Sequence, residues 1–221
     1  MAVLTAVAAA TPREPPPRPH RLLLAGLLAG PIFTAVYLLE GAFRGGGYSV
    51  LRDPVSSLAL GARGWQQIAN FILCGLLVLL FSVGLRRSLR FGPGAFIVPL
   101  LVAVWGVGLL GAGIFVTDPL GGPVTWHGRL HDLAFSLPGF AALTLAMLTS
   151  AVVFARRRSP RFALYSALSG VAFAVLFVVA TLGFAGLDPY AESAGLGQRL
   201  CVSIGWLWIA LLALHRRRAR R

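Results

Sequence analysis

Hydrophobic residues occur along this chain in six long runs that short polar segments separate. A run of about 20 apolar residues forms a helix long enough to cross roughly 30 Å of membrane hydrocarbon. Such a helix satisfies its own backbone hydrogen bonds in lipid. We therefore predict an all-α polytopic membrane bundle. Its six transmembrane helices are expected near 22–39, 68–85, 95–116, 133–155, 162–187 and 200–214, the last beginning upstream near Leu196.

The overall composition supports this fold class. Of the 221 residues, 57% are apolar and 12% are charged, and the mean hydropathy is +0.79. A soluble domain is about 45–50% apolar and about 25% charged. The chain has too little polar surface to cover a water-facing globule. Soluble, fibrous and disordered classes are excluded.

The hydrophobic region lies between two polar segments. Residues 1–21 are rich in Pro and Arg, and we expect them to form a disordered cytoplasmic tail. Residues 22–215 are expected to form the six-helix transmembrane domain. Residues 216–221 are predicted to be a basic cytoplasmic tail.

The basic residues, all of them Arg, predict the orientation of the bundle. Fifteen of the 20 lie in the two tails and in the second and fourth connections, and six of the seven acidic residues lie on the other side. Arginines gather on the cytoplasmic side of membrane proteins. We therefore expect a multi-pass protein of the cell membrane with both termini cytoplasmic. Its net charge of +13 indicates contact with the lipid bilayer and anionic headgroups, and no nucleic-acid partner.

The first outer loop carries two candidate site residues. Asp53 and Ser56 suit the start of a short helix at the membrane interface, and they are also candidates for catalytic roles. On the following span, Asn70 lies one turn from Gln66. Amide side chains in lipid form hydrogen bonds across helices, so Asn70 is assigned to a polar site.

The second outer loop contains two histidines at helical spacing, His127 and His131, beside Asp118 and Asp132. Two imidazoles on one helix face with a carboxylate form a set of ligands typical of catalytic zinc. A bound zinc would turn a water into a hydrolytic nucleophile. Two alternatives stay open: a metal-free polar site, with Asp132 as a catalytic candidate, and a network with Arg129 that joins helix ends.

The third outer loop leads into a polar pair, Gln198 and Arg199. An Arg within the membrane is costly and needs a partner. Asp53, Asp132 and Glu40 are candidates, and an anionic headgroup is the alternative.

Three motifs together resemble a known family. They are Asp53-Pro-x-Ser-x-Leu with Trp65 and Asn70, then Gly113-x-Phe-x-x-Asp-Pro119, then Trp126-His-Gly-x-Leu-His-Asp132. The pattern is similar to that of a bacterial multi-pass membrane family known as domain of unknown function 998. The resemblance implies a helical membrane bundle, without an assigned activity, in which these Asp, Asn and His residues belong to one shared pattern.

These observations favour an integral membrane protein whose outer Asp/His/Arg site binds a lipid headgroup, a small ligand or a partner. The alternative is a metal-dependent membrane hydrolase or transferase acting on a lipid or envelope substrate. A transporter is the second alternative, and we rank it last because the middle of the spans carries no charged groups or broken helices.

Overall fold

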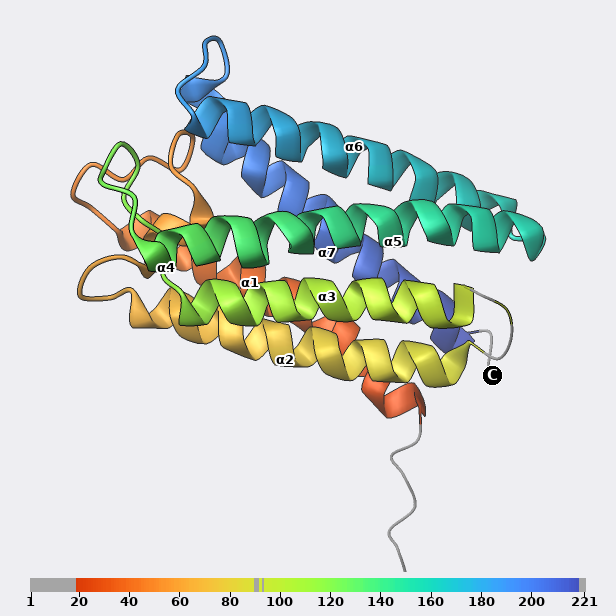
Figure 1. Ribbon diagram of the computed structural model, residues 1–221. Coiled ribbons are helices and arrows are strands. Elements are labelled where there is room, and N and C mark those ends of the chain that lie inside the picture. The colour runs from red at the N-terminus through yellow and green to blue at the C-terminus, as the bar shows by residue number, and fades with distance from the viewer. Residues whose placement is uncertain (1–18, 90–91, 93, 219–221) are drawn as a thin grey trace, which may run out of the picture.

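The computed structural model describes residues 19–89, 92 and 94–218, so most of the expected tail at 1–21 lies outside the described residues. Six long helices make up the bundle (Figure 1). They are α1 (Pro19–Phe43), α2 (Trp65–Ser88), α3 (Gly94–Ile114), α5 (Leu137–Arg156), α6 (Pro160–Phe184) and α7 (Ala194–Arg218). A short α-helix, α4 (Trp126–Arg129), and a π-helical segment, η2 (Leu130–Ser136), lead directly into α5.

The prediction of six membrane-spanning helices is confirmed. Each of the six is long and apolar enough to cross a membrane, counting α4, η2 and α5 as one span from Trp126 to Arg156. Most spans run a few residues beyond the apolar runs. Helix α2, for example, begins at Trp65 rather than near residue 68, and α7 continues to Arg218.

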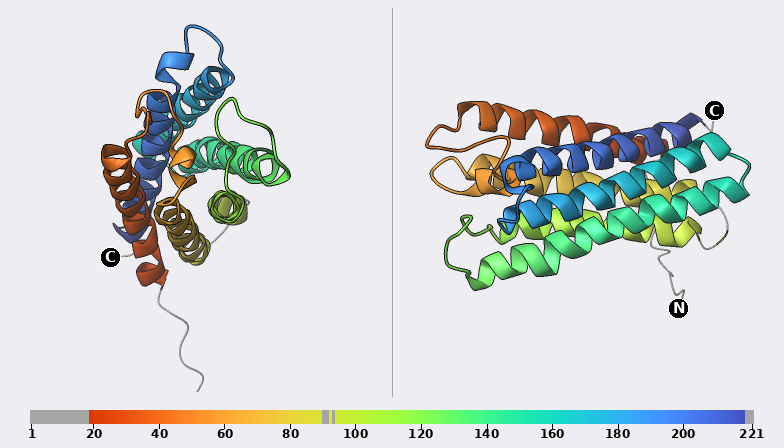
Figure 2. Two further views of the ribbon diagram at one scale, coloured as in Figure 1. Left: turned by 90° about the vertical axis from the view of Figure 1, so that its left-hand side faces the viewer. Right: turned by 90° about the horizontal axis from the view of Figure 1, so that it is seen from above.

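The helices form a closed ring in which each helix packs against two neighbours. Around the ring the order is α1, α2, α3, α5, α6 and α7, and α7 closes it against α1 (Figure 2). Aromatic side chains fill the centre. Trp105 lies 5.0 Å from Phe140 and 6.0 Å from Trp206 between ring centroids, and Trp206 lies 5.2 Å from Phe33.

The two ends of the bundle differ in charge and in loop length. At the Arg-rich end the sequence between helices is short, at 89–93 and 157–159, and this end carries ten of the arginines that the structure describes. The loop end carries the three long connections, 44–64, 115–125 and 185–193, which lie together on the left of Figure 1. All six acidic residues of the described part of the chain are at the loop end.

The outside of the ring is apolar. On α6, for example, Leu168, Val171, Val175 and Val178 recur every three or four residues and are all more than half exposed. This spacing places them on one helix face. A continuous exposed apolar face suits contact with lipid acyl chains rather than with water.

Candidate functional site

A cavity of about 460 Å³ lies at the loop end, where residues of all six long helices and of η2 line it together with residues of the three loops. Its walls are mostly apolar and include Phe33, Phe71, Trp105, Phe140, Phe177 and Val202. Its polar lining includes Ser56, Asp118, His131, Asp132 and Gln198. Five candidate residues therefore line one cavity, and they come from the first loop, from the second loop and η2, and from α7.

Asp118 folds the connection between α3 and α4 into a hydrogen-bonded loop. Its carboxylate accepts hydrogen bonds from the backbone N–H and from the hydroxyl of Thr125, both at 2.7 Å. These two bonds hold the pKa of the Asp118 carboxyl below its usual value, so Asp118 is ionised at neutral pH. Thr125 is also the N-cap of α4, because its hydroxyl accepts from the N–H of Gly128 at 3.2 Å.

The glycine of the Trp-His-Gly motif has a steric role in this loop. A Cβ atom at Gly128 would collide with the Asp118 carboxylate. The carboxylate can therefore approach the start of α4 only because position 128 has no side chain.

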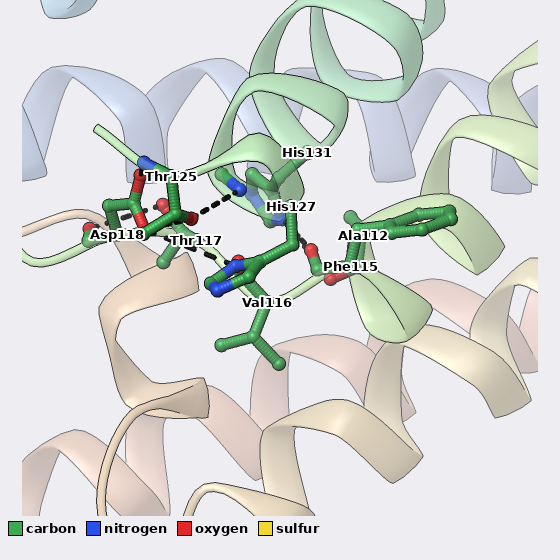
Figure 3. A network of polar contacts seen from close by, with 9 residues as sticks. Ala112, Phe115, Val116, Thr117, Asp118, Thr125, His127 and His131 are labelled. Carbon is green, nitrogen blue, oxygen red and sulfur yellow. Dashed lines mark hydrogen bonds and ion pairs between the residues drawn. The ribbon is translucent and has the colours of Figure 1, made fainter.

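The two histidines face different surroundings (Figure 3). His127 Nδ1 lies 2.9 Å from the carbonyl oxygen of Val116 and 3.9 Å from a carboxylate oxygen of Asp118, and its side chain is 41% exposed. His131 is only 3% exposed, and its Nδ1 lies 2.7 Å from the carbonyl oxygen of Phe115. His131 lines the cavity and His127 does not, so the two imidazoles do not share one pocket.

His131 lies on the π-helical segment η2, which forms part of the cavity wall. In η2 the N–H of Leu137 bonds to the carbonyl of Asp132, five residues back rather than four. The next residue is Pro138, which lacks an N–H and cannot continue an α-helical hydrogen-bond pattern behind it. Widened turns of this kind are frequent at functional sites.

The predicted zinc ligands were tested against this geometry. In the described part of the chain, no group of three or more His, Cys, Asp and Glu side chains is placed to hold a metal ion. The zinc site at His127, His131 and Asp118 therefore stays a prediction from the sequence, without a set of ligands to support it.

Arg199 and Gln198 fasten the first loop to α7. The Arg199 guanidinium is 6% exposed and donates to the backbone carbonyls of Asp53, at 2.8 Å, and Gly195, at 2.9 Å. It also bonds to the Tyr48 hydroxyl, and burial raises the pKa of that hydroxyl, so Tyr48 is neutral. Gln198 accepts from the N–H of Val55 at 2.8 Å. Arg199 is thus partnered by carbonyl groups, not by the carboxylates that the sequence suggested.

Asp53 and Ser56 have separate positions in the first loop. The Asp53 carboxylate accepts from the N–H of Ser49 at 2.6 Å and closes a turn before the short 3-10 helix η1 (Val55–Ala59). It does not cap that helix, whose N-cap is Pro54. Ser56, on η1, reaches the cavity.

The remaining polar candidates lie away from the cavity. Asn70 is 3% exposed and donates to the carbonyl of Phe33 at 3.1 Å, so it joins α2 to α1 as the sequence predicts for an amide in lipid. Arg129 is exposed and does not line the cavity.

Sequence reasoning missed two residues that hold the loops in place, Tyr48 and Thr125. A signal for Thr125 was present, because a Thr directly before a helix is a common N-cap. Tyr48 carried no such signal, since its partner Arg199 lies 151 residues away in the chain.

Comparison with known proteins identifies the family. The family described as "Protein of unknown function (DUF998)" matches residues 27–215, and the chain belongs to it. Neither the curated proteins nor the solved structures contain a match.

Proposed function

We propose that this member of the DUF998 family holds a lipid-like amphiphile in the cavity at the loop end. The observation that carries the proposal is the lining of that cavity. Aromatic and aliphatic walls such as Trp105, Phe140 and Val202 suit an acyl chain, and Asp132 and His131 suit a polar headgroup. A volume of about 460 Å³ is within the range of small-molecule sites, roughly 300–1,000 Å³.

The proposal includes an orientation. The protein would lie in the plasma membrane with both termini in the cytoplasm, so that the loop end and its cavity face outward. The distribution of arginine supports this, because the Arg-rich end carries ten of the described arginines against five at the loop end.

A matched pair of substitutions tests the cavity. Val202→Phe places a larger side chain in the cavity wall, whereas Val175→Phe makes the same change on the lipid-facing side of α6. Native mass spectrometry of the full chain from detergent would count the lipids that stay bound. We expect Val202→Phe to lose lipid at least about tenfold, and Val175→Phe to retain it.

Unfolding curves in mixed micelles would show that both variants are folded. Equal lipid retention by the two variants, or no retained lipid in the unmodified chain, would overturn the proposal.

A further inference from the structure

The charged groups around the cavity are acidic. Asp118 and Asp132 line it, and no arginine does so in the part of the chain that the structure describes. Two of the nearby loop-end arginines are engaged elsewhere. Arg199 bonds to backbone carbonyls, and Arg52 pairs with Glu192 at 3.9 Å. The cavity therefore offers negative charge to whatever occupies it.

Asp132 is the carboxylate best placed to meet a ligand. It directly follows His131 on η2, its side chain is exposed, and it makes no hydrogen bond or ion pair within residues 19–89, 92 and 94–218. Each carboxylate oxygen of Asp118 instead already accepts a hydrogen bond from Thr125, so we assign Asp118 the weaker role of contributing negative charge.

His131 adds a requirement of a different kind. Its Nδ1 contacts two carbonyl oxygens, that of Phe115 at 2.7 Å and that of Ala112 at 3.2 Å (Figure 3). Carbonyl oxygens can only accept, so Nδ1 carries the hydrogen, and in the neutral ring Nε2 presents a lone pair. No hydrogen bond to Nε2 is found among the described residues, and the ring forms part of the cavity wall. Nε2 of the 3% exposed His131 is therefore an acceptor without a hydrogen-bond partner among the described residues, and a ligand that donates a hydrogen bond would satisfy it.

We propose that the amphiphile is a membrane phospholipid whose headgroup ends in a primary ammonium. The ammonium charge would be attracted by Asp132 and Asp118, and one of its N–H groups would donate to Nε2 of His131. This inference rests on the proposed function and narrows it. It also replaces the anionic headgroup that the arginines of the sequence suggested, because those arginines do not line the cavity.

Three phospholipids with identical acyl chains separate the two requirements. Phosphatidylethanolamine has a primary ammonium, phosphatidylcholine has a quaternary one without N–H groups, and phosphatidylglycerol has no cation. The full chain would be placed in nanodiscs containing equal amounts of all three, and the retained lipid would be identified by mass spectrometry. A charge-assisted hydrogen bond predicts that phosphatidylethanolamine is enriched at least about tenfold over each of the others.

Two variants assign the preference to its residues. Asp132→Asn should reduce the enrichment over phosphatidylglycerol several-fold, and Asp188→Asn, in an exposed loop away from the cavity, is its matched control. His131→Asn keeps a donor where Nδ1 lies and removes only the Nε2 acceptor. It should abolish the enrichment over phosphatidylcholine, whereas the attraction of Asp132 and Asp118 for the ammonium charge should preserve part of the enrichment over phosphatidylglycerol.

The outcomes separate this inference from the proposed function. Lipid retention that falls in Val202→Phe but shows no headgroup preference, or a preference for phosphatidylglycerol, would overturn the inference of an ammonium headgroup. That result would leave the proposed binding of an amphiphile intact. Retention insensitive to Val202→Phe would overturn both. A preference that Asp132→Asn leaves intact would also contradict the assignment, and because Asp132 is exposed this variant should fold even if His131→Asn does not.

Discussion

At the scale of single residues, Arg199 shows how a guanidinium is accommodated near the end of a membrane span. It is 6% exposed, and its hydrogen bonds go to the carbonyls of Asp53 and Gly195 and to the hydroxyl of Tyr48. The rings of Tyr37 and Tyr48 lie 5.9 and 5.8 Å from its central carbon. The planar fork of Arg has five donors spread over three nitrogens, whereas Lys has three donors on a single nitrogen and cannot reproduce that spacing.

This arrangement predicts that a lysine, which keeps the positive charge, cannot replace Arg199 without loss of stability. Arg199→Lys should lower the free energy of unfolding by about 3 kcal/mol, because it loses charged hydrogen bonds in a buried place. Arg129→Lys is the control, since Arg129 is exposed, and it should change the value by less than about 0.5 kcal/mol. Equilibrium unfolding in mixed micelles measures both. If Arg199→Lys were as stable as Arg129→Lys, Arg199 would not be what holds the first loop against α7.

Residue types in the sequence predicted some of these roles and not others. The amide of Asn70 could be assigned to an interhelical hydrogen bond, since lipid offers it no water. The partner of Arg199 could not be assigned, because any backbone carbonyl can accept and the sequence does not mark which one is near. The same holds for His131, whose acceptors at positions 112 and 115 follow from the close approach of α3 and η2.

At the scale of elements, the cavity depends on how closely η2 packs on α3. A Cβ at Gly108 would lie 2.8 Å from the carbonyl oxygen of Phe135 and 3.2 Å from the Cα of Gly139. Both atoms belong to backbone, which cannot rotate away as a side chain can. The absence of a side chain at position 108 therefore sets the distance between the two elements.

A single methyl group at position 108 should push α3 and η2 apart. Gly108→Ala should lower the free energy of unfolding by about 2 kcal/mol through overpacking. In contrast, Gly197→Ala places its Cβ 3.7 Å from Ala180, which is ordinary contact, and should be neutral or stabilising by up to about 1 kcal/mol. Unfolding curves of the two variants give the comparison. A stable Gly108→Ala protein would show that η2 is free to move away from α3.

The elements themselves were largely predictable. Six apolar runs gave six helices because length and hydrophobicity suffice to identify a membrane span. The π-helical turn at 130–136 could not be predicted, since its hydrogen bonds differ from α-helical ones by one residue and leave the apolar pattern unchanged. His131 lines the cavity beside residues 112 and 115, and the apolar pattern does not show that approach, so the candidate site was less predictable than the fold.

At the scale of the whole molecule, the contrast between the Arg-rich end and the loop end carries the orientation. The native thiols allow a clean test, because Cys74 and Cys201 are both buried with 0% exposure. A thiol introduced at one end of the bundle would then be the accessible one.

Two Ser→Cys substitutions compare the ends. Ser193→Cys lies at the loop end before α7, and Ser159→Cys lies at the Arg-rich end before α6. On intact cells a membrane-impermeant maleimide should label Ser193→Cys and not Ser159→Cys, and permeabilised cells should label both. The reverse pattern would place the arginines outside and contradict the proposed orientation.

The cavity at the loop end does not continue through the bundle. In the Arg-rich half, Phe81, Leu85, Phe154 and Leu212 are at most 3% exposed and fill the space between the helices. A bound ligand would therefore have to enter and leave the cavity at the loop end. In the described residues the cavity is thus closed toward the Arg-rich end, and a lipid bound as proposed would exchange with only one leaflet of the membrane.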